Sequence, residues 1–575
     1  MRDVSRIKLP TFIHEVIDDP RQRGILVAGT LAMLAVGLVP RVLSPGLPNA
    51  QEAIRTDPEV QNLFVLLAFA STATIILGGL VSDLLRRRWL LVGGLLVMAA
   101  ASLLAAVAVR EAVFYAANFV NVAASGLVLA YAIGSVAVAY EGIPRATALG
   151  FVYAAFGLGA AASPALLTFF PELLPSSEPG VPSSFTFDTW LAYLVTAVAA
   201  GVAAWVARRR IPAIPGTLPA QRKLIVSIAI WSIAVLAVAS GVLGLLGPGG
   251  ELLPVALIVV GSAVLGTIVF RFRRTVDDWG QLRLDQRGVG AALAVGVAIG
   301  FAQAVPLMFL PIVFEYPFDY GQWVAIIAIA PFAIALLAAG PVAGALIRRF
   351  GPRGMMTGGT LVLGLSNLVL ALALGWITGR VRAAVSVDPT GGTAGLPEFH
   401  YLPFVVPLAL VGAGFVLATT VRTAVVFAST PRGLPGSAAA INEASVGLGS
   451  RIGIVAATSA MTVAAVGSAR DMIERNPDAA ARVGATADEF SEILVALGTP
   501  RFREVYGATM ANAEDIKRIA YSVAYIDGVV VALILCGIAG LGGAVLAWVL
   551  MGRRDPIKAV FDMQDERERE DYTPS

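Results

Sequence analysis

Gly79-Leu-Val-Ser-Asp83-Leu-Leu-Arg86-Arg87-Arg88 separates two long apolar runs of this chain. The first run ends at this stretch, and the second begins at Trp89. Each run is about 20 residues long, which is the length that crosses a bilayer as a helix. Short cytoplasmic loops of membrane proteins collect Lys and Arg, so the stretch predicts a cytoplasmic turn between two transmembrane helices.

A weaker copy of this turn lies far downstream. It reads Gly344-Ala-Leu-Ile-Arg348-Arg349-Phe350-Gly351-Pro352-Arg353 and again separates two apolar runs. Two similar turns in corresponding places predict a chain built from two related halves.

Composition supports a membrane protein over its whole length. The 575 residues are 57% apolar and 14% charged, with a mean hydropathy of +0.78, whereas soluble domains carry about 25% charge. Because the runs are continuously apolar and do not alternate, we expect an all-α polytopic protein and no barrel. His14, His400 and the lone Cys536 lie far apart, so we expect no metal site, no cofactor and no enzyme activity. The arginines gather in short turns, which predicts no nucleic-acid partner.

Fourteen runs are long enough to span a bilayer. They are 24–43, 61–82, 89–109, 114–139, 147–170, 190–207, 224–246, 253–270, 289–314, 322–347, 355–377, 402–428, 437–467 and 527–551. With the N-terminus inside, almost all arginines of short loops face the cytoplasm, so both termini are predicted to be cytoplasmic.

These runs predict the domain boundaries. We expect a cytoplasmic tail at 1–23, a six-helix bundle at 24–207 and a linker with two extra helices at 208–288. A second six-helix bundle follows at 289–551, and a cytoplasmic tail at 552–575. The loops 171–189, 378–401 and 468–526 are outer segments, and the charged 468–526 is expected to form a small extracytoplasmic helical cap.

The fifth run contains a second motif. It reads Gly150-Phe-Val-Tyr-Ala-Ala-Phe-Gly-Leu-Gly159-Ala-Ala-Ala-Ser163-Pro164. Small residues let neighbouring helices approach closely, and Pro164 predicts a kink near the outer end.

Together, the two motifs resemble those of a major facilitator superfamily transporter of the fourteen-helix drug/proton antiporter type. Gly79, Asp83, Arg87 and Arg88 match the gating motif of that family, and Gly150, Gly159, Ser163 and Pro164 match its antiporter motif. The stretches Arg432–Asn442 and Gly449–Gly453 are also similar to this family. The resemblance implies alternating access between two halves.

Polar residues inside the predicted spans are candidates for function because they are costly in hydrocarbon. Arg41 either lines the cavity or reaches back to the interface, and Gln303 either contacts substrate or bonds to another helix. Asn121, Tyr153 and Arg451 are further candidates for the substrate cavity.

Arg422 and Glu443 lie at matched depths on consecutive spans, about 9 Å from the cytoplasmic edge. That depth predicts an ion pair, either a fixed structural bridge or a switch that protonation breaks. Glu443 is the one carboxylate well inside any predicted span, so it is the candidate for proton coupling.

The leading functional hypothesis is a monomeric, multi-pass exporter of the cell membrane that moves amphiphilic small molecules in exchange for protons. Because embedded arginines outnumber acids, a permease for an anionic or neutral metabolite or lipid is the alternative. A non-transporting membrane sensor or assembly partner, with 468–526 as its binding module, is a third hypothesis.

Overall fold

A computed structural model describes most of the apolar runs. The described residues are 16–39, 71–79, 81–82, 87–108, 111–168, 187–212, 230, 233–234, 237–238, 241, 252–271, 287–315, 324, 327–387, 400–429, 435–475 and 525–551. Within these ranges every regular element is a helix, as the continuous apolar runs predict.

The helices fall into two groups along the chain. The first group contains α2 (Pro20–Leu38), α5 (Arg87–Ala106), α6 (Glu111–Ala139), α7 (Gly142–Thr168) and α8 (Phe187–Arg210). After α10 (Leu252–Arg271), the second group contains α11 (Arg287–Glu315), α13 (Ala330–Val387), α14 (Leu402–Ser429), α15 (Pro435–Arg475) and α20 (Ile526–Leu550). Helix α2 shows why one of these boundaries falls where it does, because the Asp19 carboxylate caps it by accepting from the Arg21 amide at 2.8 Å and Pro20 fits its first turn.

Nine of the described helices are long and apolar enough to cross a membrane. One of them, α13, contains two of the expected spans. Half of the expected span 61–82 and most of 224–246 lie outside the described residues, so the total of fourteen stays a prediction.

The break inside α13 coincides with the downstream arginine-rich turn. Gly351 has φ 71° and ψ 164°, in the positive-φ region that glycine adopts without strain. Pro352 follows and starts the next helix, since proline fits a first helical turn. The turn therefore reverses the chain between the two spans 322–347 and 355–377.

Two helices extend beyond their predicted ends. Helix α13 continues to Val387 and α15 to Arg475, whereas hydropathy predicts ends at 377 and 467. The added turns contain no proline, and in α15 an Arg470–Glu474 ion pair of 3.0 Å joins residues one turn apart. Helix α15 has 41 residues, about 60 Å at 1.5 Å per residue, against about 30 Å of hydrocarbon.

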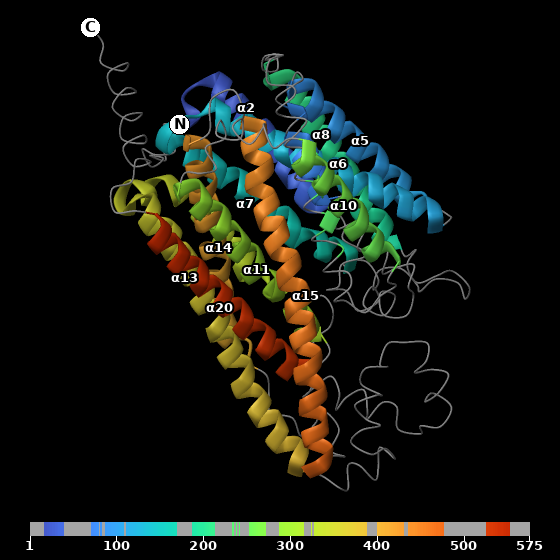
Figure 1. Cartoon of the computed structure of the whole chain (residues 1–575), viewed down its shortest axis with the longest axis vertical. Helices are drawn as coiled ribbons and strands as arrows, with labels where there is room; N and C mark the ends of the chain where they lie inside the picture. Colours follow the sequence, from blue (N-terminus) through green and yellow to red (C-terminus); the bar gives the residue numbers. More distant parts are fainter. Residues whose placement is uncertain are drawn as a thin grey trace, which may run out of the picture.

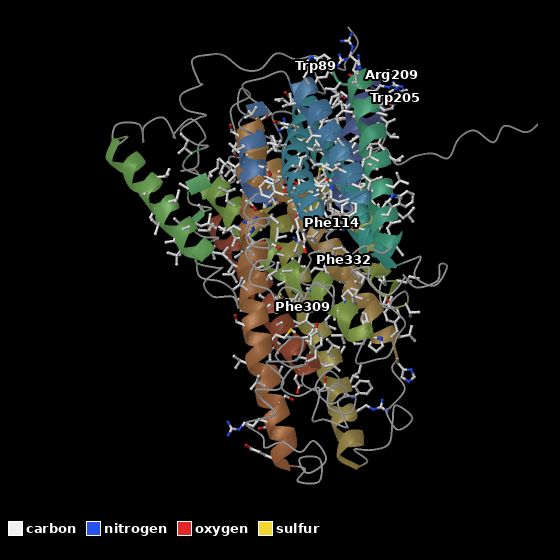
Figure 2. The ribbon with its side chains drawn as sticks, turned by 90° about the vertical axis from the view of Figure 1, so that its right-hand side faces the viewer. Trp89, Phe114, Trp205, Arg209, Phe309 and Phe332 are labelled. Atoms are coloured by element: carbon white, nitrogen blue, oxygen red, sulfur yellow. The ribbon has the colours of Figure 1, made fainter. Side chains whose placement is uncertain are left out.

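The two groups meet along a limited set of helices. Figure 1 shows α5, α6 and α8 on one side of the molecule and α13 and α20 on the other. Contacts between the groups run mainly from α7 to α13 and α14, and from α6 to α15. Helix α10 stands apart at the side of the bundle in Figure 2, and Gly261 packs it against Ala234, Ala237 and Val238.

One end of the bundle gathers arginines, and we call it the arginine-rich end. Tyr140 bonds to the Val16 carbonyl there, Gly24 lies against Arg210, and Thr147 lies against Gly344. Figure 2 shows Trp89, Trp205 and Arg209 together at this end.

Arginines stack on aromatic rings at both ends. The guanidinium of Arg209 lies 4.1 Å from the Trp205 ring centroid, and that of Arg353 lies 3.9 Å from Trp548. At the opposite end, Arg380 lies 5.1 Å from Trp376. Exposed tryptophans of this kind are typical of the two membrane interfaces. Which end faces the cytoplasm stays a prediction.

Candidate functional site

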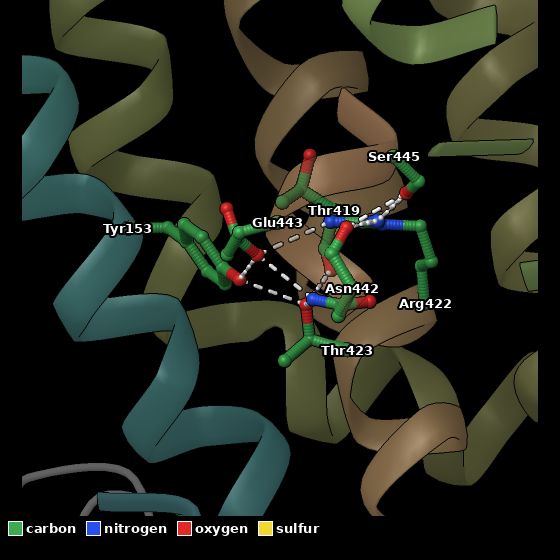
Figure 3. Close-up of polar contacts among 7 residues, drawn as sticks. All are labelled: Tyr153, Thr419, Arg422, Thr423, Asn442, Glu443 and Ser445. Atoms are coloured by element: carbon green, nitrogen blue, oxygen red, sulfur yellow. Dashed lines mark hydrogen bonds and ion pairs between the residues drawn. The ribbon is translucent and has the colours of Figure 1, made fainter. Parts of the chain in front are cut away.

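A buried polar network lies where α7 of the first group meets α14 and α15 of the second group. Its members are Tyr153, Arg422, Thr423, Asn442, Glu443 and Ser445, shown in Figure 3. Each of them is at least nine-tenths buried. We call this set the Glu443 network.

Helix α7 packs against α13 with one face and against α2 with the opposite face. Tyr153 reaches the network from the face that packs against α13. A β-carbon at Gly150 would overlap the Gly340 carbonyl oxygen of α13, and one at Gly157 would overlap Leu336. Tyr153 lies between these glycines on the same face. Gly159, nine residues or two and a half turns after Gly150, lies on the opposite face. There its Cβ position meets the Leu34 carbonyl of α2.

The carboxylate of Glu443 accepts three hydrogen bonds on one oxygen. Its Oε1 lies 2.5 Å from the Tyr153 hydroxyl and 2.8 Å from Asn442 Nδ2. Arg422 NH2 lies 3.3 Å from the same oxygen, which is the ion pair that their matched depths predict. The Tyr153 hydroxyl also lies 2.8 Å from Thr423 Oγ1, so Tyr153 contacts both α14 and α15.

Arg422 is anchored within the second group. Its side chain is fully buried, and NH1 donates to the Asn442 carbonyl at 2.6 Å and to Ser445 Oγ at 2.9 Å. Gly296 of α11 makes room for this cluster, because a β-carbon there would overlap both Ser445 Oγ and Arg422 NH1. A buried charge requires such pairing, because the desolvation cost otherwise exceeds what the fold tolerates.

The network pairs one acid with one arginine. Glu443 has one guanidinium and two neutral donors as neighbours. Arg422 has two further bonds that do not involve this carboxylate, to the Asn442 carbonyl and to Ser445. Arg422 Nε and Asn442 Oδ1 are buried without a hydrogen-bond partner among the described residues, which raises the free energy of this arrangement.

Other predicted cavity residues lie apart from the network. Gln303, half-buried on α11, makes no hydrogen bond within the part of the chain that the structure describes. Arg451 lies two turns beyond Glu443 on α15. Asn121 is fully buried inside the first group, where its Nδ2 donates to Ser102 Oγ of α5 at 3.0 Å. Arg41 lies outside the described residues.

The two motifs are described in part. A β-carbon at Gly79 would overlap the Gly436 carbonyl at the start of α15, so this glycine does allow close approach of a neighbouring helix. Ser163 Oγ donates to the Val39 carbonyl, at 3.3 Å. Asp83 lies outside the described residues. For Arg87 and Pro164 the description covers the helical backbone and leaves out the side chains.

The sequence analysis missed three members of the network. Thr423, Asn442 and Ser445 complete the hydrogen bonds of Arg422 and Glu443. A signal for one of them was present, because Thr419, Thr420 and Thr423 surround Arg422 in an otherwise apolar run. Small polar residues around an embedded charge indicate that the charge has buried partners.

Comparisons with known proteins agree with this architecture. The family model described as Major Facilitator Superfamily matches residues 25–454. A comparison with curated proteins gives no significant match. Among solved structures, the proton:xylose symporter XylE, with 6-bromo-6-deoxy-D-glucose bound, is similar at a TM-score of 0.52 and 13% identity, covering 94% of this chain and 98% of that one.

Two peptide-transporter structures are also similar. A bacterial homologue of the human drug peptide transporters PepT1 and PepT2 has a TM-score of 0.51 at 15% identity, covering 94% of this chain and 99% of that one. A proton-dependent oligopeptide transporter structure has a TM-score of 0.50 at 14% identity, covering 92% and 99%. At these identities the likeness concerns the fold, whereas the family model covers most of the sequence. The chain therefore belongs to the major facilitator superfamily and is a multi-pass membrane transporter.

Proposed function

We propose that this transporter exports hydrophobic or amphiphilic small molecules across the cell membrane in exchange for protons, by alternating access. The observation that carries the proposal is the position of Glu443. Its carboxylate lies at the contact between the two helix groups and bonds to both of them. A proton taken up there changes a charge at the boundary that alternating access must open and close.

The proposed role of Glu443 follows from its surroundings. Arg422 and Tyr153 both stabilise the ionised form of the Glu443 carboxylate. The Glu443 side chain is about 10% exposed. Proton relays inside membranes are built from such embedded acids. The proposed working unit is a monomer without cofactor, in contact with lipid, protons and one amphiphilic substrate.

The substrate class has a second candidate. Arg422 and Arg451 lie in the same half as a single embedded carboxylate, Glu443, and this balance favours an anionic or neutral substrate over a cationic one. A permease for an anionic or neutral metabolite or lipid is therefore the alternative on the same scaffold.

Inverted membrane vesicles test the proposal. We expect accumulation of lipophilic dyes in wild-type vesicles when the interior is acidic, and a loss of at least ten-fold in E443Q. E474Q, which changes an exposed acid at the far end of α15, is the matched control and keeps wild-type accumulation. Accumulation that ignores the pH gradient would exclude antiport. The dyes tested include anionic and cationic ones. If the vesicles accumulate the anionic dyes in preference to the cationic ones, the permease hypothesis is favoured.

A further inference from the structure

The arginine-rich end of the transporter is closed in this structure. Backbone meets backbone between the groups at Gly150 and Gly340, and Thr147 meets Gly344. Gly79 lies against Gly436 at the start of α15. Alternating access to this side requires these contacts to separate.

The glycine contacts bring the two groups together, but they carry no charge that a proton could change. Tyr153 differs from the glycines because it donates a hydrogen bond across the boundary to a carboxylate. Its hydroxyl reaches Glu443 Oε1 at 2.5 Å and lies 2.8 Å from Thr423 Oγ1. A hydrogen bond to an ionised carboxylate is about twice as strong as one between neutral groups.

Two charged or titratable side chains of the described chain are in contact with the Glu443 carboxylate. Among the described residues these are Arg422 from α14 and Tyr153 from α7. Where other elements pack on this part of α15, α11 presents Gly296 and Gly300, and the segment 71–79 presents Thr72. A change in the charge of Glu443 therefore acts on Arg422 and the neutral Asn442 inside its own group, and on Tyr153 across the boundary.

These two partners respond differently to a proton. When hydronium transfers a proton to Glu443 Oε1, one O–H bond breaks in hydronium and one forms on the carboxylate, which becomes a neutral carboxylic acid. Arg422 keeps its NH1 bonds to the Asn442 carbonyl and Ser445 Oγ, so it stays in place. Tyr153 loses its ionised acceptor and is left with two neutral partners, the carboxylic acid and the Thr423 hydroxyl, so its bond across the boundary weakens.

We propose that Tyr153 is the positioning residue that holds the two helix groups together at the arginine-rich end, and that protonation of Glu443 releases it. With Glu443 ionised, the Tyr153 bond favours the closed arginine-rich end. With Glu443 protonated, that end opens. The inference rests on the proposed function, because it assigns the transported proton to Glu443.

Spin-label distances measure this directly, without transport. Labels at Arg208→Cys in α8 and Arg349→Cys in α13 place one probe on each group, at exposed positions of the arginine-rich end. The background carries Cys536→Ala, which removes the one native cysteine. In lipid nanodiscs we expect a short distance at pH 8 and a growing longer population as the pH is lowered.

The Y153F variant keeps the ring and removes the hydroxyl. We expect its ratio of open to closed populations at pH 8 to rise about ten-fold or more, the effect of one lost hydrogen bond to a charged group. Y193F is the matched control, because Tyr193 is equally buried and its hydroxyl bonds to Asn118 inside the first group. It is expected to keep the wild-type distances.

The outcomes separate this inference from the proposed function. E443Q is expected to be open at every pH. A pH response that persists in E443Q overturns Glu443 as the trigger and as the proton site. A wild-type distribution in Y153F at all pH values overturns Tyr153 as the residue that holds the groups, and leaves the proton site of Glu443 standing.

Discussion

Arg422 joins two helices of the second group, α14 and α15. It is the largest fully buried side chain of the described chain, and three partners from α15 pair with its two terminal nitrogens, NH1 and NH2. Such an arginine serves two purposes, since it balances Glu443 and ties α14 to α15. The first belongs to the proposed function and the second to the fold, and we expect mutants to separate them.

Removing Arg422 is expected to destabilise the protein strongly. R422A leaves the Glu443 carboxylate buried without its counter-charge, at a cost of about 3–5 kcal/mol in the free energy of unfolding. Thermal unfolding is followed by the reaction of Cys536, the one cysteine and fully buried, with a thiol-reactive fluorophore. The double variant R422A/E443Q is expected to recover part of the loss. Equal midpoints for R422A and wild type would show that the pair is dispensable for folding.

The sequence predicts part of this network. Counting residues from the span ends places Arg422 and Glu443 at one depth, and the structure pairs them at 3.3 Å. The sequence does not predict that Tyr153 joins this pair. Tyr153 and Glu443 are 290 residues apart, and their contact depends on how the two groups pack. An aromatic residue in an apolar helix is also more often a packing residue, so its type gives no signal.

Helix α7 connects both groups at the level of elements. The spacing of Gly150 and Gly159 predicts close helix contacts but does not say that they point in opposite directions. The structure shows that Gly150 serves α13 and Gly159 serves α2. The sequence also does not predict the extensions of α13 and α15. Hydropathy indicates where a run of apolar residues ends, whereas a helix can continue beyond that run.

A methyl group at position 150 is expected to impair closure of the arginine-rich end. G150A forces α7 and α13 apart, since the new β-carbon would overlap the Gly340 carbonyl. We expect a transport rate reduced several-fold and a lower unfolding midpoint. G93A in α5 is the control, because nothing lies within 4 Å of its β-carbon position, and alanine stabilises a helix by up to about 1 kcal/mol over glycine. Indistinguishable behaviour of the two variants would contradict tight packing at Gly150.

The whole molecule keeps a family fold at low sequence identity. Only 13% of residues agree with the xylose symporter, yet the alignment covers 94% of this chain. Apolar runs and the arginine-rich turns between them are enough to predict that architecture. Substrate contacts are not, since they depend on side chains whose positions differ between relatives.

Membrane orientation is tested at this scale. Asp18 is exposed near the arginine-rich end, and Glu474 is exposed at the far end of α15. In the Cys536→Ala background, we expect an impermeant maleimide to label Glu474→Cys in intact cells and Asp18→Cys only in inverted vesicles. The reverse pattern would place the arginine-rich end outside and invert the predicted topology.

The opposite glycine faces of α7 limit the kind of motion that can open this transporter. A helix held by backbone contacts on both sides cannot turn about its own axis without breaking one of them. Because Gly159 and Gly37 fix α7 to α2, the two helices tilt as one unit when Gly150 leaves Gly340. We therefore expect the opening to move α2 and α7 together, and a crosslink between α2 and α7 should not hinder it.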